Sequence, residues 1–89
     1  MILVVDSGST KTDWIALDDN GKEIFSTQTL GLNPQMLSNE ILNERIKNNF
    51  DIYKNRNSVS KLFFYGAGCG VDSTQNRILK VFKSIFQNS

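Results

Sequence analysis

Four short segments of this 89-residue sequence have the hydrophobic pattern of β-strands. They are predicted at 2–6, 13–18, 22–29 and 61–65. Three are runs of apolar, mostly β-branched or aromatic residues, as in buried strands, whereas 22–29 alternates like a half-exposed edge strand. Because a continuous apolar strand usually has cover on both faces, we expect 2–6 to lie in the middle of a sheet. Asn20-Gly21 favours a turn that makes the first three strands a meander.

Two helices are predicted by apolar residues that recur at steps of three and four. One spans roughly 39–52 and the other roughly 74–87. Their apolar stripes comprise Ile41, Leu42, Ile46, Phe50 and Tyr53 in the first, and Ile78, Leu79, Phe82, Ile85 and Phe86 in the second. Ser38 is a suitable N-cap for the first helix, and Asp72 or Ser73 for the second. We expect both stripes to pack in the core.

The order strand-strand-strand-helix-strand-helix predicts an α/β fold with a mixed sheet. A strand–helix–strand crossover is almost always right-handed and gives parallel strands, so the third and fourth strands should share one direction. The meander makes strand two antiparallel to its neighbours, and strands one, three and four are therefore mutually parallel. Residues 54–60 read as a polar surface loop. The chain is one small domain or part of one.

Three unusual loops follow the strands that share a direction. They are residues 6–13, 30–34 and 66–70. The carboxyl ends of parallel strands meet at one edge of a sheet, and ligands of open α/β sheets bind at that edge. The other two connections, at the Asn20-Gly21 turn and at residues 54–60, fall at the opposite edge. The strand directions alone therefore predict a binding site where the three loops converge.

The first of these loops, 6–13, has the composition of a phosphate-binding hairpin. Gly8 allows close approach to a phosphate, and Lys11 can neutralise its charge. Hydroxyl donors are supplied by Ser9, Thr10 and Thr12. The loop matches neither of the glycine-rich phosphate loops that open a helix, because an apolar strand follows it. The alternative is an ordinary polar hairpin turn. In either case Asp13 is interpreted as a turn residue rather than a metal ligand.

The other two loops offer candidates for substrate binding. Asn33 carries both a donor and an acceptor, which suits a sugar hydroxyl or acetamido group, although an Asx turn before Pro34 is an equal alternative. Gly66 and Gly68 allow a tight backbone near the substrate cleft. Cys69 is interpreted as a packed thiol, because the sequence contains no histidine to activate it.

Composition and charge exclude several classes of partner. Ten lysines and arginines against nine acidic residues give a net charge of +1, without a basic cluster, so no nucleic-acid partner is expected. The apolar run at 2–6 is too short for a signal peptide or a membrane span, so no membrane partner is expected either. A single cysteine favours a reducing, cytoplasmic setting.

The segment Asp-Ser-Gly-Ser-Thr-Lys-Thr at 6–12 resembles the first phosphate motif of the actin-like ATPases. This superfamily includes acetate and sugar kinases, heat-shock ATPases and actin. The Thr-Lys-Thr ending, with Gly-Leu-Asn-Pro at 31–34 and Tyr-Gly-Ala-Gly-Cys at 65–69, resembles the branch of BadF/BadG/BcrA/BcrD ATPases and N-acetylglucosamine kinases. The resemblance implies a ribonuclease H-like half-domain that binds ATP and Mg²⁺. In that family the aspartate matching Asp6 acts near the metal, usually through water.

The resemblance covers only the opening segment of such an enzyme, so we interpret residues 1–89 as an N-terminal fragment of a sugar kinase, with little or no activity alone. The resemblance places the general base of catalysis, the second phosphate loop and the adenine pocket beyond Ser89. Unpaired strand edges and helix faces of such a piece favour self-association. Two alternatives stay open. One is a BadF/BadG-type ATPase activator that couples hydrolysis to a partner, and the other is a non-catalytic interaction module.

Overall fold

The structure, a computed structural model, describes residues 1–8, 10–66 and 72–88. Its strands are β1 (Ile2–Ser7), β2 (Lys11–Leu17), β3 (Glu23–Leu30) and β4 (Lys61–Gly66). Its helices are α1 (Asn39–Lys47), α2 (Phe50–Lys54), the short 3₁₀ helix η1 (Arg56–Ser58) and α3 (Asp72–Ile85). Within the described ranges, no helix is long and apolar enough to cross a membrane.

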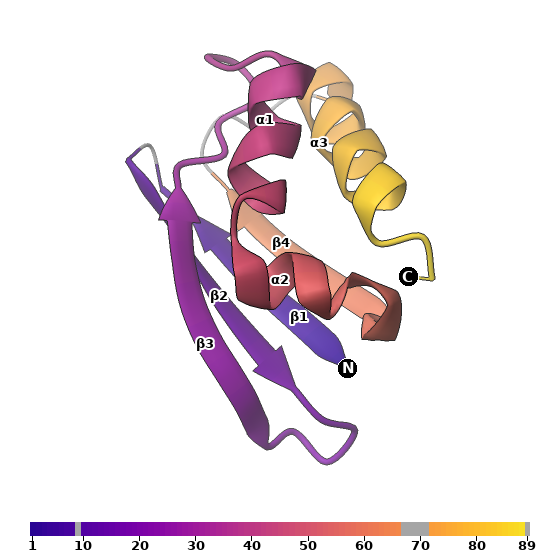
Figure 1. Cartoon of the computed structure of the whole chain (residues 1–89). Coiled ribbons are helices and arrows are strands. Elements are labelled where there is room, and N and C mark those ends of the chain that lie inside the picture. Colours follow the sequence, from indigo (N-terminus) through magenta and orange to yellow (C-terminus); the bar gives the residue numbers. More distant parts are fainter. Residues whose placement is uncertain (9, 67–71, 89) are drawn as a thin grey trace.

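The four strands form one mixed sheet in the order β3-β2-β1-β4. β2 runs antiparallel to both β1 and β3, whereas β1 and β4 are parallel. β1, β3 and β4 therefore share one direction, as the sequence predicted, and β1 lies inside the sheet. The carboxyl ends of these three strands meet at the edge of the sheet where the hairpin between β1 and β2 lies (Figure 1).

All three α-helices cover the same face of the sheet (Figure 1). On the covered face Leu3 and Val5 of β1 are fully buried. On the other face Ile15, Phe63 and Tyr65 are exposed, with exposed fractions of 37%, 47% and 63%. Among the described residues, β1 has helices on one face only, where the sequence predicted cover on both, because α1, α2 and α3 all pack on one side. We call the uncovered side the open face.

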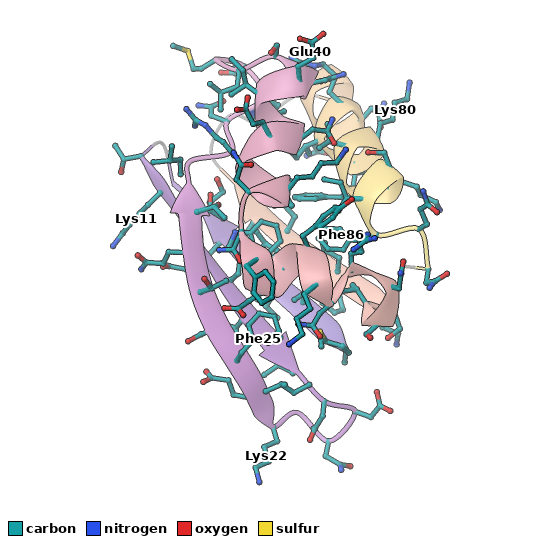
Figure 2. All side chains as sticks on the ribbon, in the orientation of Figure 1. Lys11, Lys22, Phe25, Glu40, Lys80 and Phe86 are labelled. Atoms are coloured by element: carbon teal, nitrogen blue, oxygen red, sulfur yellow. The ribbon has the colours of Figure 1, made fainter. Side chains whose placement is uncertain are left out.

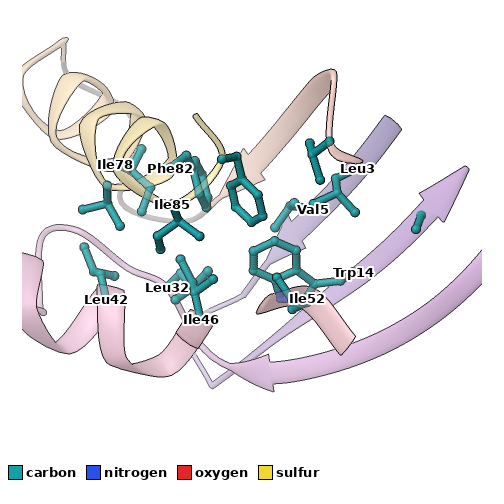
Figure 3. Packing of buried hydrophobic residues seen from close by; sticks show 14 residues of the cluster. Leu3, Val5, Trp14, Leu32, Leu42, Ile46, Ile52, Ile78, Phe82 and Ile85 are labelled. Carbon is teal, nitrogen blue, oxygen red and sulfur yellow. The ribbon is translucent and has the colours of Figure 1, made fainter. Parts of the chain in front are cut away.

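The core lies between the covered face and the helices, and it is centred on Trp14. The rings of Trp14 and Phe82 form a T-shaped pair, with centroids 6.2 Å apart and an interplanar angle of 89°, and the ring centroid of Phe86 lies 6.3 Å from that of Trp14. Figure 3 shows strand residues converging with Leu42, Ile46, Ile52, Ile78, Phe82 and Ile85 of the helices. The predicted stripe of α3 is largely confirmed, although Leu79 is exposed.

The helix predicted over 39–52 is in fact two helices, α1 and α2, broken at Asn48 and Asn49. Asn49 is extended (φ −86°, ψ 115°), and its side-chain oxygen caps α2 by accepting from the N–H of Ile52. Its Nδ2 donates to Thr27 Oγ1 at 3.0 Å, which fixes the break against β3. The break turns Phe50 out of the predicted stripe, and its side chain is 74% exposed.

Candidate functional site

The connection between β1 and β2 is a tight hairpin rather than an eight-residue loop. Ser7 pairs with Thr12 across the two strands, and the N–H of Gly8 donates to the carbonyl of Lys11 at 2.8 Å. The residues of the predicted loop 6–13 thus lie mostly in strands, with the tip at 8–10. Ser9 itself lies outside the described residues. The segment does bridge two antiparallel strands, as expected for a hairpin site.

A buried hydroxyl pair explains why the strands continue to the hairpin tip. Thr12 is fully buried. Its hydroxyl donates to Ser7 Oγ at 2.9 Å, and the carbonyl of Leu30, 3.1 Å away, is a second acceptor for the same hydroxyl. Ser7 Oγ also accepts from the N–H of Leu32 at 3.0 Å. In the described part of the chain, no buried side-chain polar atom lacks a partner. The hydroxyl of Thr12 therefore faces the protein interior, away from the tip.

The hairpin is tied to the loop that follows β3. The N–H of Gly31 donates to the carbonyl of Thr10 at 3.0 Å. Arg45 of α1 donates from Nη1 to the carbonyl of Gly31 at 2.5 Å. Together with the bond between Leu32 and Ser7, these contacts hold two of the three predicted loops side by side. Of the third predicted loop, 66–70, residues 67–70 lie outside the described residues.

Asn33 lies at the start of a compact turn. Its Oδ1 accepts from the N–H of Gln35 at 2.9 Å, and its carbonyl accepts from the N–H groups of Met36 and Leu37. This is the Asx turn that the sequence left open. The side chain is half-buried, and among the described residues no acceptor takes up its Nδ2. The amide nitrogen is therefore the part of Asn33 that is left for a ligand.

Arg77 of α3 fixes the segment after Asn33. Its guanidinium donates to the carbonyls of Pro34 and Leu37 at 2.5 and 2.8 Å. A third bond, 3.1 Å long, runs from Nε to Oδ1 of Asn39 at the start of α1. One planar guanidinium thus joins α3, the loop and α1, a task that needs the forked donor geometry of arginine.

Two carboxylates lie together on the open face at the end of β1. Asp6 pairs directly with Asp13 of β2, which is in a strand and not in a turn, and Asp13 Oδ1 accepts from Gln28 Nε2 at 2.6 Å. Asp6 is exposed. Mg²⁺ is commonly held by one or two carboxylates together with phosphate oxygens and water, so this pair fits the ion. Among the described residues no third acidic, cysteine or histidine side chain joins the pair.

Lys11 lies at the start of β2, two residues before Asp13 and therefore on the same side of the strand. It is exposed, and Figure 2 shows its side chain reaching away from the sheet. With Arg45, Asn48 and Asn49 it lines a groove of about 480 Å³ between the end of β3 and the end of α1. The carboxylates line a separate groove on the open face, and Gln28 borders both. The lysine of the hairpin therefore lines one groove and its two carboxylates line the other, and Gln28 of β3 contributes to both.

Gly66 lies at the end of β4, beside Ser7 of β1. A Cβ atom at this position would lie 2.3 Å from two carbons of the Phe64 ring, so the ring occupies the space that a side chain would need. The structure thus gives Gly66 a packing role at the sheet edge. Gly68 and Cys69 lie outside the described residues.

Replacing Gly66 with alanine should destabilise the fold by about 1–3 kcal/mol, because the added methyl group overpacks the ring of Phe64. Urea denaturation followed by circular dichroism measures this loss. In the double variant Gly66→Ala/Phe64→Leu the methyl group gains room, so the two losses should be less than additive. Additive losses would show that the ring is not what excludes a side chain.

The general base of catalysis was expected beyond Ser89, and this stays a prediction. Ser89 itself lies outside the described residues. The carboxylates at the hairpin, Asp6 and Asp13, lie on the open face and are the ones that fit a metal ion. We therefore assign neither of them the role of the base.

Three residues that organise the site were not singled out from the sequence. Ser7 had a usable signal, since it continues the buried alternation of Leu3 and Val5 and therefore needs an internal partner. Arg45 and Arg77 had none, because each acts on the carbonyls of a distant loop. Contacts of this kind depend on how the helices pack.

Comparison with solved structures gives an informative similarity. No protein-family model matches the chain, and no curated protein matches it. Among solved structures, the crystal structure of a "putative N-acetylglucosamine kinase" from Porphyromonas gingivalis is similar, with a TM-score of 0.87 and 31% sequence identity. The match covers 99% of this chain and 31% of the other, so the chain spans about a third of that protein's length. The chain therefore has the fold of one segment of a kinase-like protein.

Proposed function

We propose that this chain is the phosphate-binding segment of an ATP-dependent kinase that acts on an amino sugar such as N-acetylglucosamine. The observation that carries the proposal is the tie between the hairpin at 6–12 and the Asn33 loop, which sets a phosphate motif beside a polar loop at one sheet edge. The similarity to the Porphyromonas gingivalis protein supports it, as does the resemblance of the motif to actin-like ATPases of the BadF/BadG and N-acetylglucosamine kinase branch.

In this proposal the exposed groups of the hairpin bind the nucleotide. Gly8 leaves room for the phosphates at the tip, Ser9 and Thr10 offer hydroxyl donors, and Lys11 offsets their charge. Asp6 would hold Mg²⁺, directly or through water, with Asp13 beside it. When bound, the ion supplies positive charge that stabilises the phosphates during transfer.

Other residues position the loops or face the substrate. We assign Thr12 a positioning role, because its hydroxyl is bonded to Ser7 inside the protein. Asn33 would donate from Nδ2 to an oxygen of the sugar. Gly66 and Gly68 would allow the backbone after β4 to pass close to the bound sugar. The catalytic base and the adenine site are assigned to the part of the kinase fold that this chain does not span.

Nucleotide binding is tested by titrating the chain with Mg²⁺ and ATP while amide signals are followed by NMR. The amides of Thr10 and Lys11 should shift, while those of the Asn20-Gly21 turn at the opposite edge should not. No ATP turnover is expected from this chain. If no amide of the hairpin shifts, the chain is better explained as an interaction module.

The variant Gly8→Ala separates binding from folding. A Cβ atom at Gly8 would meet the Lys11 carbonyl oxygen at 3.4 Å, an ordinary contact, so stability should be unchanged. The methyl group stands where the phosphates would approach, so the Kd for Mg²⁺-ATP should rise at least about tenfold, which is 1.4 kcal/mol. Asp19→Ala, in the opposite turn, is the matched control. Unchanged affinity in Gly8→Ala would contradict the proposed role of the hairpin.

The sugar is tested in the same experiment. Adding N-acetylglucosamine to the chain saturated with Mg²⁺-ATP should shift the amides of Asn33 and Gln35. Shifts with ATP but none with the sugar would leave nucleotide binding intact and remove the amino sugar as substrate. This result would favour the alternative of an ATPase activator.

A further inference from the structure

The turn between β2 and β3 contains Asn20 followed by Gly21, and both residues are exposed. Figure 1 shows this turn projecting beyond the helices, at the end of the sheet opposite the hairpin between β1 and β2. Apart from its chain neighbours, a Cβ atom at Gly21 would meet no atom of the described residues within 4 Å. Among the same residues, the side-chain amide of Asn20 has no hydrogen-bond partner. The side chain can therefore rotate toward the backbone nitrogen that follows it.

This arrangement allows a reaction between the side chain and the backbone. The Gly21 nitrogen loses its proton and adds to Cγ of Asn20, which closes a succinimide ring, and Nδ2 leaves as ammonia with a proton in exchange. Water then opens the ring at either of its two carbonyls. One product is aspartate, and the other is isoaspartate, in which the backbone runs through the former side chain. Glycine favours the attack because it has no Cβ atom in the way and a freely rotating backbone.

Asn20 is the one asparagine of the sequence that is followed by glycine. The best internal comparison is Asn57, which is also exposed and is followed by Ser58. The N–H of Ser58 donates to the carbonyl three residues before it at 3.0 Å, and the N–H of Gly21 makes the same kind of bond at 3.0 Å. The two sites thus share exposure and backbone bonding, and they differ in the side chain that follows the asparagine.

Asp18 holds the turn closed. Its Oδ1 accepts from the N–H groups of Asn20 and Lys22, both at 2.9 Å. Its carbonyl accepts from the N–H of Gly21 at 3.0 Å, which engages the nitrogen that has to attack. The turn must therefore open before the ring can close. Both side-chain bonds are exposed to solvent, so the turn can open locally while the rest of the sheet stays folded.

We propose that Asn20 is a site of spontaneous deamidation and isomerisation, and that the carboxylate of Asp18 sets the rate by holding the turn closed. Either product adds a carboxylate next to Asp18 and Asp19 and takes the net charge of the chain from +1 to zero. Isoaspartate also adds an atom to the backbone inside the turn, which displaces Gly21 from its bond to Asp18. This inference does not depend on the proposed kinase function.

The site is tested by incubating the purified chain at mildly alkaline pH and mapping its peptides by mass spectrometry. Asn20 should exchange its NH₂ for OH while Asn57 in the same sample stays intact, and an isoaspartyl methyltransferase used as a reagent should label the modified peptide. Gly21→Asn is the matched variant, because asparagine tolerates the φ of +82° but adds a Cβ atom. It should slow the reaction at Asn20 to the rate seen at Asn57. Deamidation of Asn57 before Asn20, or an unchanged rate in Gly21→Asn, would overturn the assignment.

A pair of variants tests the role of Asp18. Asp18→Ala removes the acceptor of two bonds and should raise the rate at Asn20 at least about fivefold, the effect of one lost hydrogen bond of ordinary strength on an opening equilibrium. Asp18→Asn keeps a side-chain oxygen that accepts the same bonds, so its rate should stay near that of the wild-type chain. The chain unfolded in urea gives the upper limit, because no turn is left to open. Equal rates in the folded wild-type chain and in Asp18→Ala, or in the folded and unfolded chains, would overturn the control by Asp18.

Discussion

Replacing Trp14 with alanine is expected to cost about 3–5 kcal/mol of unfolding free energy, the range for truncating a large buried aromatic side chain. Trp14 is fully buried and contacts Phe82 and Phe86, and its Nε1 donates to Thr29 Oγ1 at 3.0 Å. A domain of this size has about 5–10 kcal/mol in total, so a large part of its stability would be lost. Denaturation in urea, followed by far-ultraviolet circular dichroism, measures the change.

The control separates packing from the hydrogen bond. Trp14→Phe keeps an aromatic ring in the core but leaves Thr29 without its donor, so its loss should be clearly smaller than that of the alanine variant. Because Trp14 is the single tryptophan of the sequence, tryptophan fluorescence cannot follow either variant. Equal losses for the two substitutions would mean that the indole nitrogen, rather than ring packing, dominates.

The second large effect is expected for Arg77→Ala, with a loss of about 2–4 kcal/mol. The substitution removes three hydrogen bonds from a charged donor, each of which contributes about 1.5–3 kcal/mol when measured singly, and such terms are not additive. It also frees the segment after Asn33 from α3. Hydrogen exchange of the Met36 and Leu37 amides, together with urea denaturation, measures both consequences.

Two controls make this expectation specific. Arg77→Lys keeps the charge but cannot bond to three acceptors in fork geometry, so it should recover only part of the loss. Lys80→Ala changes an exposed residue of the same helix, labelled in Figure 2, and should alter stability by less than about 0.5 kcal/mol. Faster exchange in all three variants would point to α3 as a whole instead of to the guanidinium.

Much of the fold could be predicted from local patterns in the sequence. Strand alternation and the Asn20-Gly21 turn define the meander, where Gly21 has a φ of +82°. The crossover rule then orients β4 parallel to β1, and the direction of the strands brings the hairpin and the Asn33 loop to one edge. These features depend on the period of apolar side chains, which the sequence displays, and on the handedness of strand crossovers, which is common to all proteins.

The features that were not predicted depend on contacts between distant segments. Phe50 fits the apolar stripe of a continuous helix, but the side chain of Asn49 bonds to Thr27 on β3 and starts a new helix. The sequence predicted that the hydroxyl of Thr12 donates to a ligand, but in the structure it donates to Ser7 on the neighbouring strand. In both cases a polar side chain has a choice of partners, and tertiary packing decides which one it takes.

The pairing of β1 with β4 joins segments that are about sixty residues apart in the sequence. Ile2 pairs with Lys61, the N–H of Ser60 donates to the carbonyl of Met1 at 2.8 Å, and the Met1 ammonium donates to the carbonyl of Ser58 at 3.1 Å. The entropy of closing so long a loop must be overcome before any of these bonds can form. We expect the meander, whose loops are short, to assemble early and the pairing of β1 with β4 to limit the rate of folding.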